Sequence, residues 1–164
     1  MRKLASLCLA LLALVCLAAN VQAQEIRNDY FSLNLPADWN STVSKPQSNG
    51  SVTVLLQSKT DKLVITITVV PAPLPAQMLA EQTVQSMRTG GITVKEPVQQ
   101  GDSYVVEFSH DTKQVKGLNY FTSNGSKGSV VTIMAPDTDG FAKGKAFLQE
   151  TLKPVDARLF PASY

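Results

Sequence analysis

The stretch KLVITITVV at residues 62–70 constrains the fold of this chain more than any other segment. Branched and apolar side chains occupy both alternating sets of positions, so neither face of a strand here suits free exposure to water. Residues 52–57 and 130–134 show the same two-sided pattern. Strands of this kind are typical of a sheet that is covered on both faces. We therefore expect a layered fold in which helices pack on a sheet.

The other strands are predicted from alternating apolar positions bounded by turn residues. They cover residues 31–35, 52–57, 62–70, 92–98, 104–108, 116–122 and 129–135. Residues 40–51 are rich in Ser, Asn, Gly and Pro, and this composition predicts a loop. Short polar turns between consecutive strands indicate antiparallel pairing.

Two amphipathic helices interrupt and close this series of strands. The first is expected to begin near Pro75, because a missing N–H costs nothing in a first turn, and to end at Gly90-Gly91. The second begins within residues 137–139, where an Asp or Thr can cap it, and is expected to end at Pro154. The predicted fold class is α+β, an antiparallel sheet with helices packed on its faces.

Residues 1–23 have the pattern of a secretory signal peptide, with a basic start, an apolar stretch at 4–19 and a small-residue cleavage site. We expect cleavage between Ala23 and Gln24. The apolar stretch is shorter than the ~20 residues of a membrane-spanning helix. The expected product is a periplasmic or secreted single domain, residues 24–164, with no transmembrane segment after cleavage.

Both cysteines, Cys8 and Cys16, lie in this leader, so the folded part lacks disulfides, thiol nucleophiles and cysteine metal sites. Val15 stands directly before Cys16, where a lipoprotein signal has a small residue, and this disfavours a lipid anchor. The whole chain has 15 basic and 13 acidic residues. Loss of Arg2 and Lys3 with the leader balances them, so charge gives no case for binding nucleic acid.

The segment SHDT at residues 109–112 contains His110, the only histidine. A catalytic triad needs groups that converge in space, whereas neighbours at a strand end point in different directions. An exposed His110 in a polar turn is therefore favoured over a hydrolase that uses His110.

Metal and cofactor sites are not expected either. The segment DTDG at 137–140 lacks the third acidic ligand of a calcium loop, and a helix cap explains it more simply. One histidine without a cysteine does not make a zinc site. The sequence thus predicts a protein that is not an enzyme.

Three aromatic residues are candidate contacts for a ligand or partner. Trp39 is the only tryptophan, and a core role is favoured for it over stacking on a sugar or anchoring a partner. Phe160 and Tyr164 belong to the tail at residues 155–164, which either docks on the domain or serves as an exposed contact.

Three segments carry a resemblance to a known family. They are FSLNLPADW at 31–39, the helix AQMLAEQTVQSMRTGG at 76–91, and VVTIMAPDTDGFAKGKAFLQETL at 130–152. Together with the hairpin and the meander between them, they resemble the PsbP-like and DcrB-like domains over roughly residues 28–155. The resemblance implies an α/β/α sandwich.

That family resemblance also implies a function. Such domains are generally non-enzymatic: bacterial members are envelope proteins associated with phage adsorption or envelope maintenance, and photosynthetic members are accessory subunits of a membrane complex. The bacterial members are often lipoproteins, and this sequence departs from them at Cys16. The resemblance implies an exported accessory or binding module that contacts another envelope protein. The alternative is a periplasmic protein that binds a small ligand near Trp39.

Overall fold

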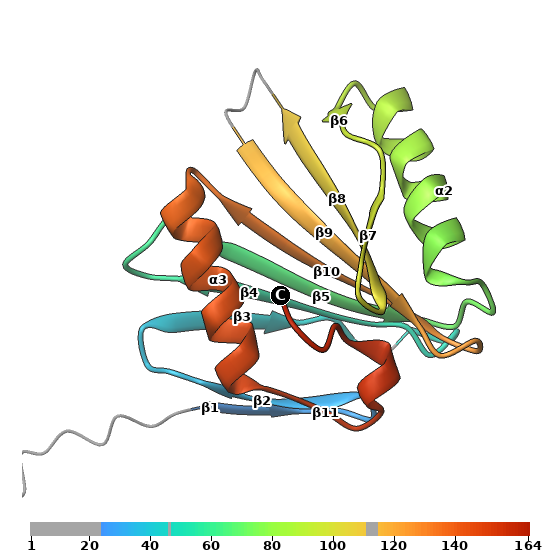
Figure 1. The fold of residues 1–164 in the computed structure, drawn as a ribbon. Coiled ribbons are helices and arrows are strands. Elements are labelled where there is room, and N and C mark those ends of the chain that lie inside the picture. Colours follow the sequence, from blue (N-terminus) through green and yellow to red (C-terminus); the bar gives the residue numbers. More distant parts are fainter. Residues whose placement is uncertain (1–23, 46, 111–114) are drawn as a thin grey trace, which may run out of the picture.

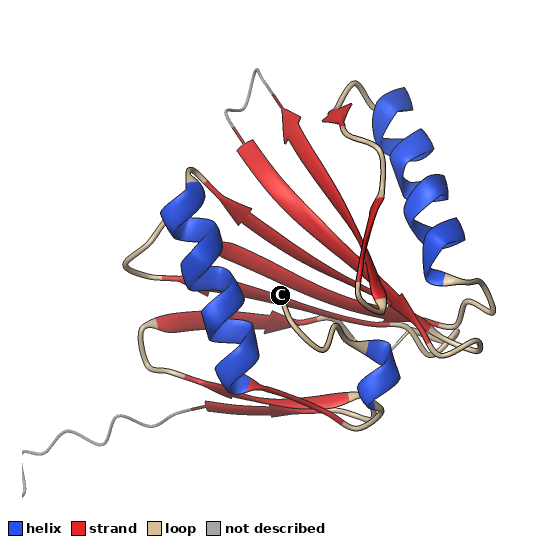
Figure 2. Ribbon diagram, viewed as in Figure 1, coloured by secondary structure: helices blue, strands red, loops and turns tan. Residues whose placement is uncertain are grey.

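A computed structural model describes residues 24–45, 47–110 and 115–164 (Figure 1). The predicted signal peptide, with Cys8 and Cys16, lies outside the described residues. Antiparallel strands carry two packed helices, so the predicted α+β class is confirmed (Figure 2).

The strands are β1 (Gln24–Arg27), β2 (Phe31–Leu35), β3 (Trp39–Val43), β4 (Val52–Ser58), β5 (Val64–Val70), β6 (Thr93–Val94), β7 (Val98–Gln100), β8 (Ser103–His110), β9 (Val115–Ser123), β10 (Gly128–Ala135) and β11 (Leu152–Pro154). The helices are α2 (Ala76–Thr89), α3 (Thr138–Thr151) and the short 3₁₀ helix η2 (Ala157–Leu159).

The strands form two antiparallel sheets. The larger sheet has the order β3-β4-β5-β10-β9-β8-β6, with β7 also paired to β8. The smaller sheet has the order β1-β2-β11, so the last strand of the chain pairs with one of the first. The register places Leu152 opposite Leu33.

The two helices lie on opposite faces of the larger sheet (Figure 1). Successive residues of a strand point to opposite faces. One side, which we call the inner face, carries Ile65 and Ile133 in the main core with α3 and the smaller sheet. The other side, the outer face, carries Val106 and Phe121, which pack with Val84 of α2.

Each helix covers only part of its face. The main contacts of α3 are with β10, β11 and β2, and those of α2 are with β6, β8 and β9. Among the described helices, neither α2 nor α3 has its main contacts on the inner face of β8 or on the outer face of β4 and β5, and the inner face of β9 is contacted by the short η2. On β5, Val64, Thr66 and Thr68 stay half-exposed. Coverage of both faces was expected for this strand, and it is found only on the inner face, because α2 packs over the other half of the sheet.

Helix α3 approaches the sheet closely at Gly144. A Cβ atom there would lie 2.7 Å from Cγ2 of Ile133, closer than real Cβ contacts. The helix is capped by Asp137, whose Oδ1 accepts a hydrogen bond from the Gly140 N–H at 2.9 Å. The cap explanation of DTDG is thus confirmed.

Removing the Asp137 cap is expected to reduce stability by a small, measurable amount. Asp137→Ala is expected to lower the free energy of unfolding by about 1 kcal/mol, because the Gly140 N–H loses its acceptor. Urea denaturation followed by circular dichroism measures the loss. Asp139→Ala is the control, since its carboxylate forms only an exposed ion pair with Lys143. Equal losses for the two variants would contradict the assignment.

Two predicted segments were wrong at their boundaries. Residues 40–51 were expected to be a loop, but Trp39–Val43 forms β3 and pairs with β4, with Trp39 opposite Ser58. The expected end of the last helix at Pro154 is also wrong, because α3 ends at Thr151 and Leu152–Pro154 joins the smaller sheet. In both places, pairing with a distant strand decides the structure.

The strand expected at residues 92–98 is divided. Thr93–Val94 forms β6 and Val98–Gln100 forms β7, and both pair with β8. Pro97 lies between them and has no N–H to donate to a ladder.

Candidate functional site

A groove of about 560 Å³ lies on the inner face of β8 and β9, beside α3. We call it the inner-face groove. Its lining includes Val105 from β8, Lys116, Leu118 and Tyr120 from β9, and Phe141 and Lys145 from α3. The groove occupies the part of the inner face that α3 leaves uncovered.

The secondary structure explains why these side chains meet. Lys116, Leu118 and Tyr120 alternate along β9 and therefore share one face. The register places Val105 opposite Tyr120. On α3, Phe141 and Lys145 are four positions apart, so they also share a face of the helix.

The floor of the groove is apolar and half-exposed. Val105, Leu118 and Phe141 are each partly accessible and pack against the main core. They leave an apolar surface open to solvent beside a closed core. Such concave apolar surfaces with a few polar groups are typical of ligand sites.

The groove carries an excess of positive charge. Lys95 and Glu107 both line it and pair with each other, with 2.5 Å between Nζ and Oε2, and Glu107 lies opposite Leu118. The side-chain ammonium groups of Lys116 and Lys145 form no hydrogen bond or ion pair with the other residues that the structure describes. Two ammonium groups are thus uncompensated next to apolar surface.

Two tyrosine hydroxyls are buried without a hydrogen-bond partner within the described ranges, those of Tyr120 and Tyr164. Their rings meet edge to face, with centroids 5.2 Å apart and an interplanar angle of 71°. Burial raises the pKa of the Tyr164 phenol well above its usual value, and the nearby Tyr120 phenol adds to the shift. Tyr120 is fully buried and lines the inner-face groove.

The C-terminal tail docks on the domain, which decides between the two alternatives left open for residues 155–164. The hydroxyls of Thr122 and Ser129 both donate to the carbonyl oxygen of Leu159. Phe160 is 1% exposed and packs edge to face on Phe31, with centroids 5.6 Å apart. The tail is therefore part of the core.

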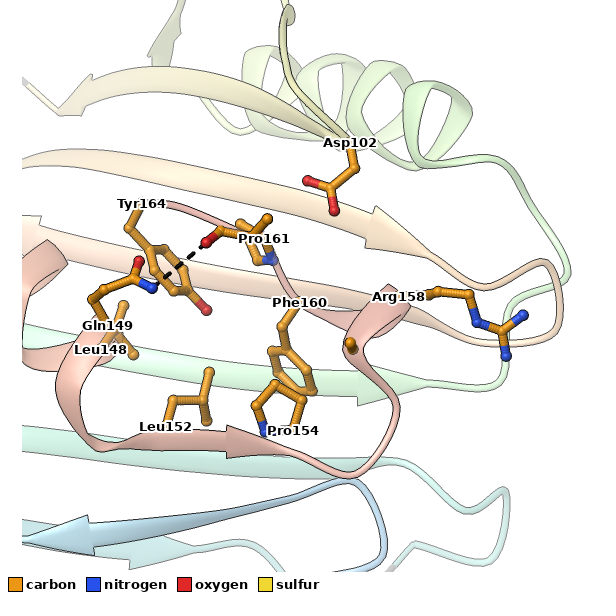
Figure 3. Close-up of a pocket in the computed structure, with 11 residues that line it drawn as sticks. Asp102, Leu148, Gln149, Leu152, Pro154, Arg158, Phe160, Pro161 and Tyr164 are labelled. Carbon is orange, nitrogen blue, oxygen red and sulfur yellow. Dashed lines mark hydrogen bonds between the residues drawn. The ribbon is translucent and has the colours of Figure 1, made fainter.

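A second groove, of about 350 Å³, is lined largely by this tail (Figure 3). Phe160 and Tyr164 both line it, and so does Arg158. Two nitrogens of the Arg158 guanidinium donate to Asp156, at 3.0 and 2.9 Å, and hold the pKa of that carboxyl well below its usual range. Arg158 is therefore already paired with Asp156. Of the three residues, only Arg158 is a cation, so this groove offers a ligand no unpaired charge from them.

The structure places Trp39 in the core rather than at either groove. Its side chain is 9% exposed and stacks on Phe147, with centroids 4.0 Å apart and an interplanar angle of 19°. This is the role that the sequence favoured for Trp39. The three aromatic candidates are thus not brought together, because only Phe160 and Tyr164 share a groove.

His110 is not the exposed turn residue that was expected. It is the last residue of β8, lies opposite Val115 and is half-buried. Asp111 and Thr112 of the SHDT segment lie outside the described residues. In the ranges that the structure covers, no group of three or more His, Cys, Asp or Glu side chains is placed to hold a metal ion.

Sequence reasoning did not single out the groove residues. One signal was present: Lys116 alternates with Leu118 and Tyr120, so a charged side chain stands on an otherwise apolar strand face. A cation among apolar side chains is a candidate for ligand contact. Its partners across the groove could not be identified, because they depend on how α3 crosses the sheet.

Within the described part of the chain, the helices are too short or too polar to cross a membrane. No family model matches the chain, and no curated protein matches it. Among solved structures, the chain is similar to a crystal structure from Bacteroides thetaiotaomicron, at 15% sequence identity and a TM-score of 0.43. The match covers 83% of this chain and 50% of that one, so this chain spans about half the length of that protein. A likeness this loose carries no argument about function, and the resemblance to PsbP-like and DcrB-like domains stays a prediction.

Proposed function

We propose that this chain is an exported, non-enzymatic binding module of the cell envelope that holds a small ligand in the inner-face groove. The observation that carries the proposal is the half-exposed apolar floor formed by Val105, Leu118 and Phe141. A partly accessible apolar floor in a concave site is typical of ligand pockets. Export is supported by the signal-peptide pattern of residues 1–23.

The composition of the groove suits binding better than catalysis. Its floor is apolar, and the carboxylate of Glu107, which also lines the groove, is engaged by Lys95. Catalysis by a carboxylate requires a group that is free to exchange a proton or attack a substrate. The lining instead offers contact area and cations.

Contact with another envelope protein is the second candidate, as the family resemblance implies. The outer face of β5, where Val64, Thr66 and Thr68 are half-exposed, is a surface that such a partner could cover. The two candidates use opposite faces of the sheet, so a single experiment can separate them.

Binding of a neutral fluorescent probe tests the proposed function. N-phenylnaphthylamine is expected to bind the purified exported chain and to brighten in the apolar groove. Leu118→Trp places a bulkier side chain on the groove floor and should weaken binding by about tenfold or more, because it takes up part of the space and changes the apolar surface on which the probe lies. Val43→Trp adds the same side chain on β3, at the far edge of the sheet, and should leave binding unchanged. Equal binding to all three proteins, or none, would refute the proposal.

Photo-crosslinking in intact cells separates the two candidates. A crosslinking residue at Leu118 should capture a small molecule, and one at Thr66 should capture no protein reproducibly. A single protein captured from Thr66 but not from Leu118 would overturn ligand binding in favour of the accessory role.

A further inference from the structure

The lysine charges of the inner-face groove and the buried, unpaired hydroxyl of Tyr120, one of its lining residues, point to the class of its ligand. We propose that the groove binds an amphipathic organic anion. Its apolar body lies on Leu118 and Phe141, and its acidic group pairs with Lys116 or Lys145. This inference rests on the proposed function and deepens it.

The first argument is charge complementarity. Glu107 is paired with Lys95, so Lys116 and Lys145 remain as net positive charge in the groove. Lys145 is half-buried, and its hydrocarbon stem lies on the same helix face as Phe141. Beside apolar surface, an ion pair is screened less than in bulk water. An anion with an apolar body can pair with the lysine ammonium groups and also cover the apolar side chains.

The second argument is the hydroxyl of Tyr120. Its side chain is fully buried, lines the groove and has no acceptor among the residues described. A buried donor without an acceptor is costly. An acceptor oxygen on the ligand, such as that of a carboxylate, would satisfy it. An aliphatic hydrocarbon would not.

Competition against N-phenylnaphthylamine with three matched ligands tests the class. Decanoate, decanol and decyltrimethylammonium share an alkyl chain and differ in the charge of the head group. Decanoate is expected to displace the probe at a concentration about tenfold lower than decanol, since a charge-assisted hydrogen bond adds to the apolar contact. Decyltrimethylammonium should be the weakest competitor.

Substitutions of the lysines and of Tyr120 test which side chains contact the carboxylate head group. The double variant Lys116→Ala, Lys145→Ala should remove the preference for decanoate over decanol and leave affinity for decanol within about twofold. Tyr120→Phe should weaken decanoate binding severalfold while the midpoint of urea unfolding stays the same or rises, because an unpaired buried hydroxyl is removed. Tyr164→Phe is the matched control. It removes the other unpaired phenol, which lines the tail groove, and should not change binding.

The failures of the two proposals are distinguishable. If the neutral probe binds and Leu118→Trp abolishes its binding, but the three competitors act equally, the groove is a binding site and the anion assignment is wrong. A preference for decyltrimethylammonium would also overturn that assignment, as would unchanged decanoate binding in both the lysine double variant and Tyr120→Phe. If the neutral probe itself does not bind, the proposed function fails first.

Discussion

Phe160→Ala is expected to lower the free energy of unfolding by about 3–5 kcal/mol, among the largest effects of any single substitution in this chain. The ring of Phe160 is 1% exposed and meets Phe31 edge to face at an interplanar angle of 79°. Truncation removes this aromatic contact and leaves a cavity where the tail crosses the sheet. Urea denaturation followed by circular dichroism gives the change in unfolding free energy.

A control from the same tail makes this result specific. Val155→Ala also shortens an apolar side chain, but Val155 is 70% exposed, so a change within about 0.5 kcal/mol is expected. If Phe160→Ala lost no more stability than Val155→Ala, the tail would not be docked in solution. The tail groove, which Phe160 lines, would then not exist as described.

Trp39→Ala is the second substitution with a large expected effect, again about 3–5 kcal/mol of unfolding free energy. The indole is buried and stacks on Phe147 of α3, so its removal separates the helix from β3. Thermal or urea unfolding measures the loss, with Val43→Ala on the same strand as an exposed control.

The conservative variant Trp39→Phe separates a core role from a ligand-contact role. It keeps an aromatic ring against Phe147 and should retain most of the stability. Since Trp39 lines neither groove, binding of N-phenylnaphthylamine should be unchanged. Loss of probe binding in a stable Trp39→Phe protein would show that the ligand contacts the indole instead.

Elements with local signals could be predicted from the sequence. Pro75 precedes α2 directly and Gly90 follows it, as the distribution of proline and glycine indicates. Along β5, Ile65, Ile67 and Val69 are buried while the alternate residues are half-exposed, because the period of a strand fixes which side chains share a face.

Elements that depend on distant partners could not be predicted in this way. The sequence WNSTV has the polar composition of a loop, yet it forms β3 because β4 supplies its hydrogen-bond partners. The last helix was expected to continue as far as Pro154, yet Leu152–Pro154 forms β11 because it pairs with β2. The inner-face groove has the same origin, since its lining comes from β8, β9 and α3 and depends on how they pack.

The pairing of β2 with β11 has a consequence for the order in which the chain folds. Phe31 and Leu33 lie on β2 and are fully buried, and their strand neighbours include Leu152 and Pro154 near the other end of the chain. Contacts between such distant segments form slowly, because almost the whole chain must be closed into a loop first. The β1–β2 hairpin can therefore bury its apolar side chains fully only after β11 has paired with β2. If the chain is exported as we propose, β2 can complete its pairing only after residues 152–154 have crossed the membrane.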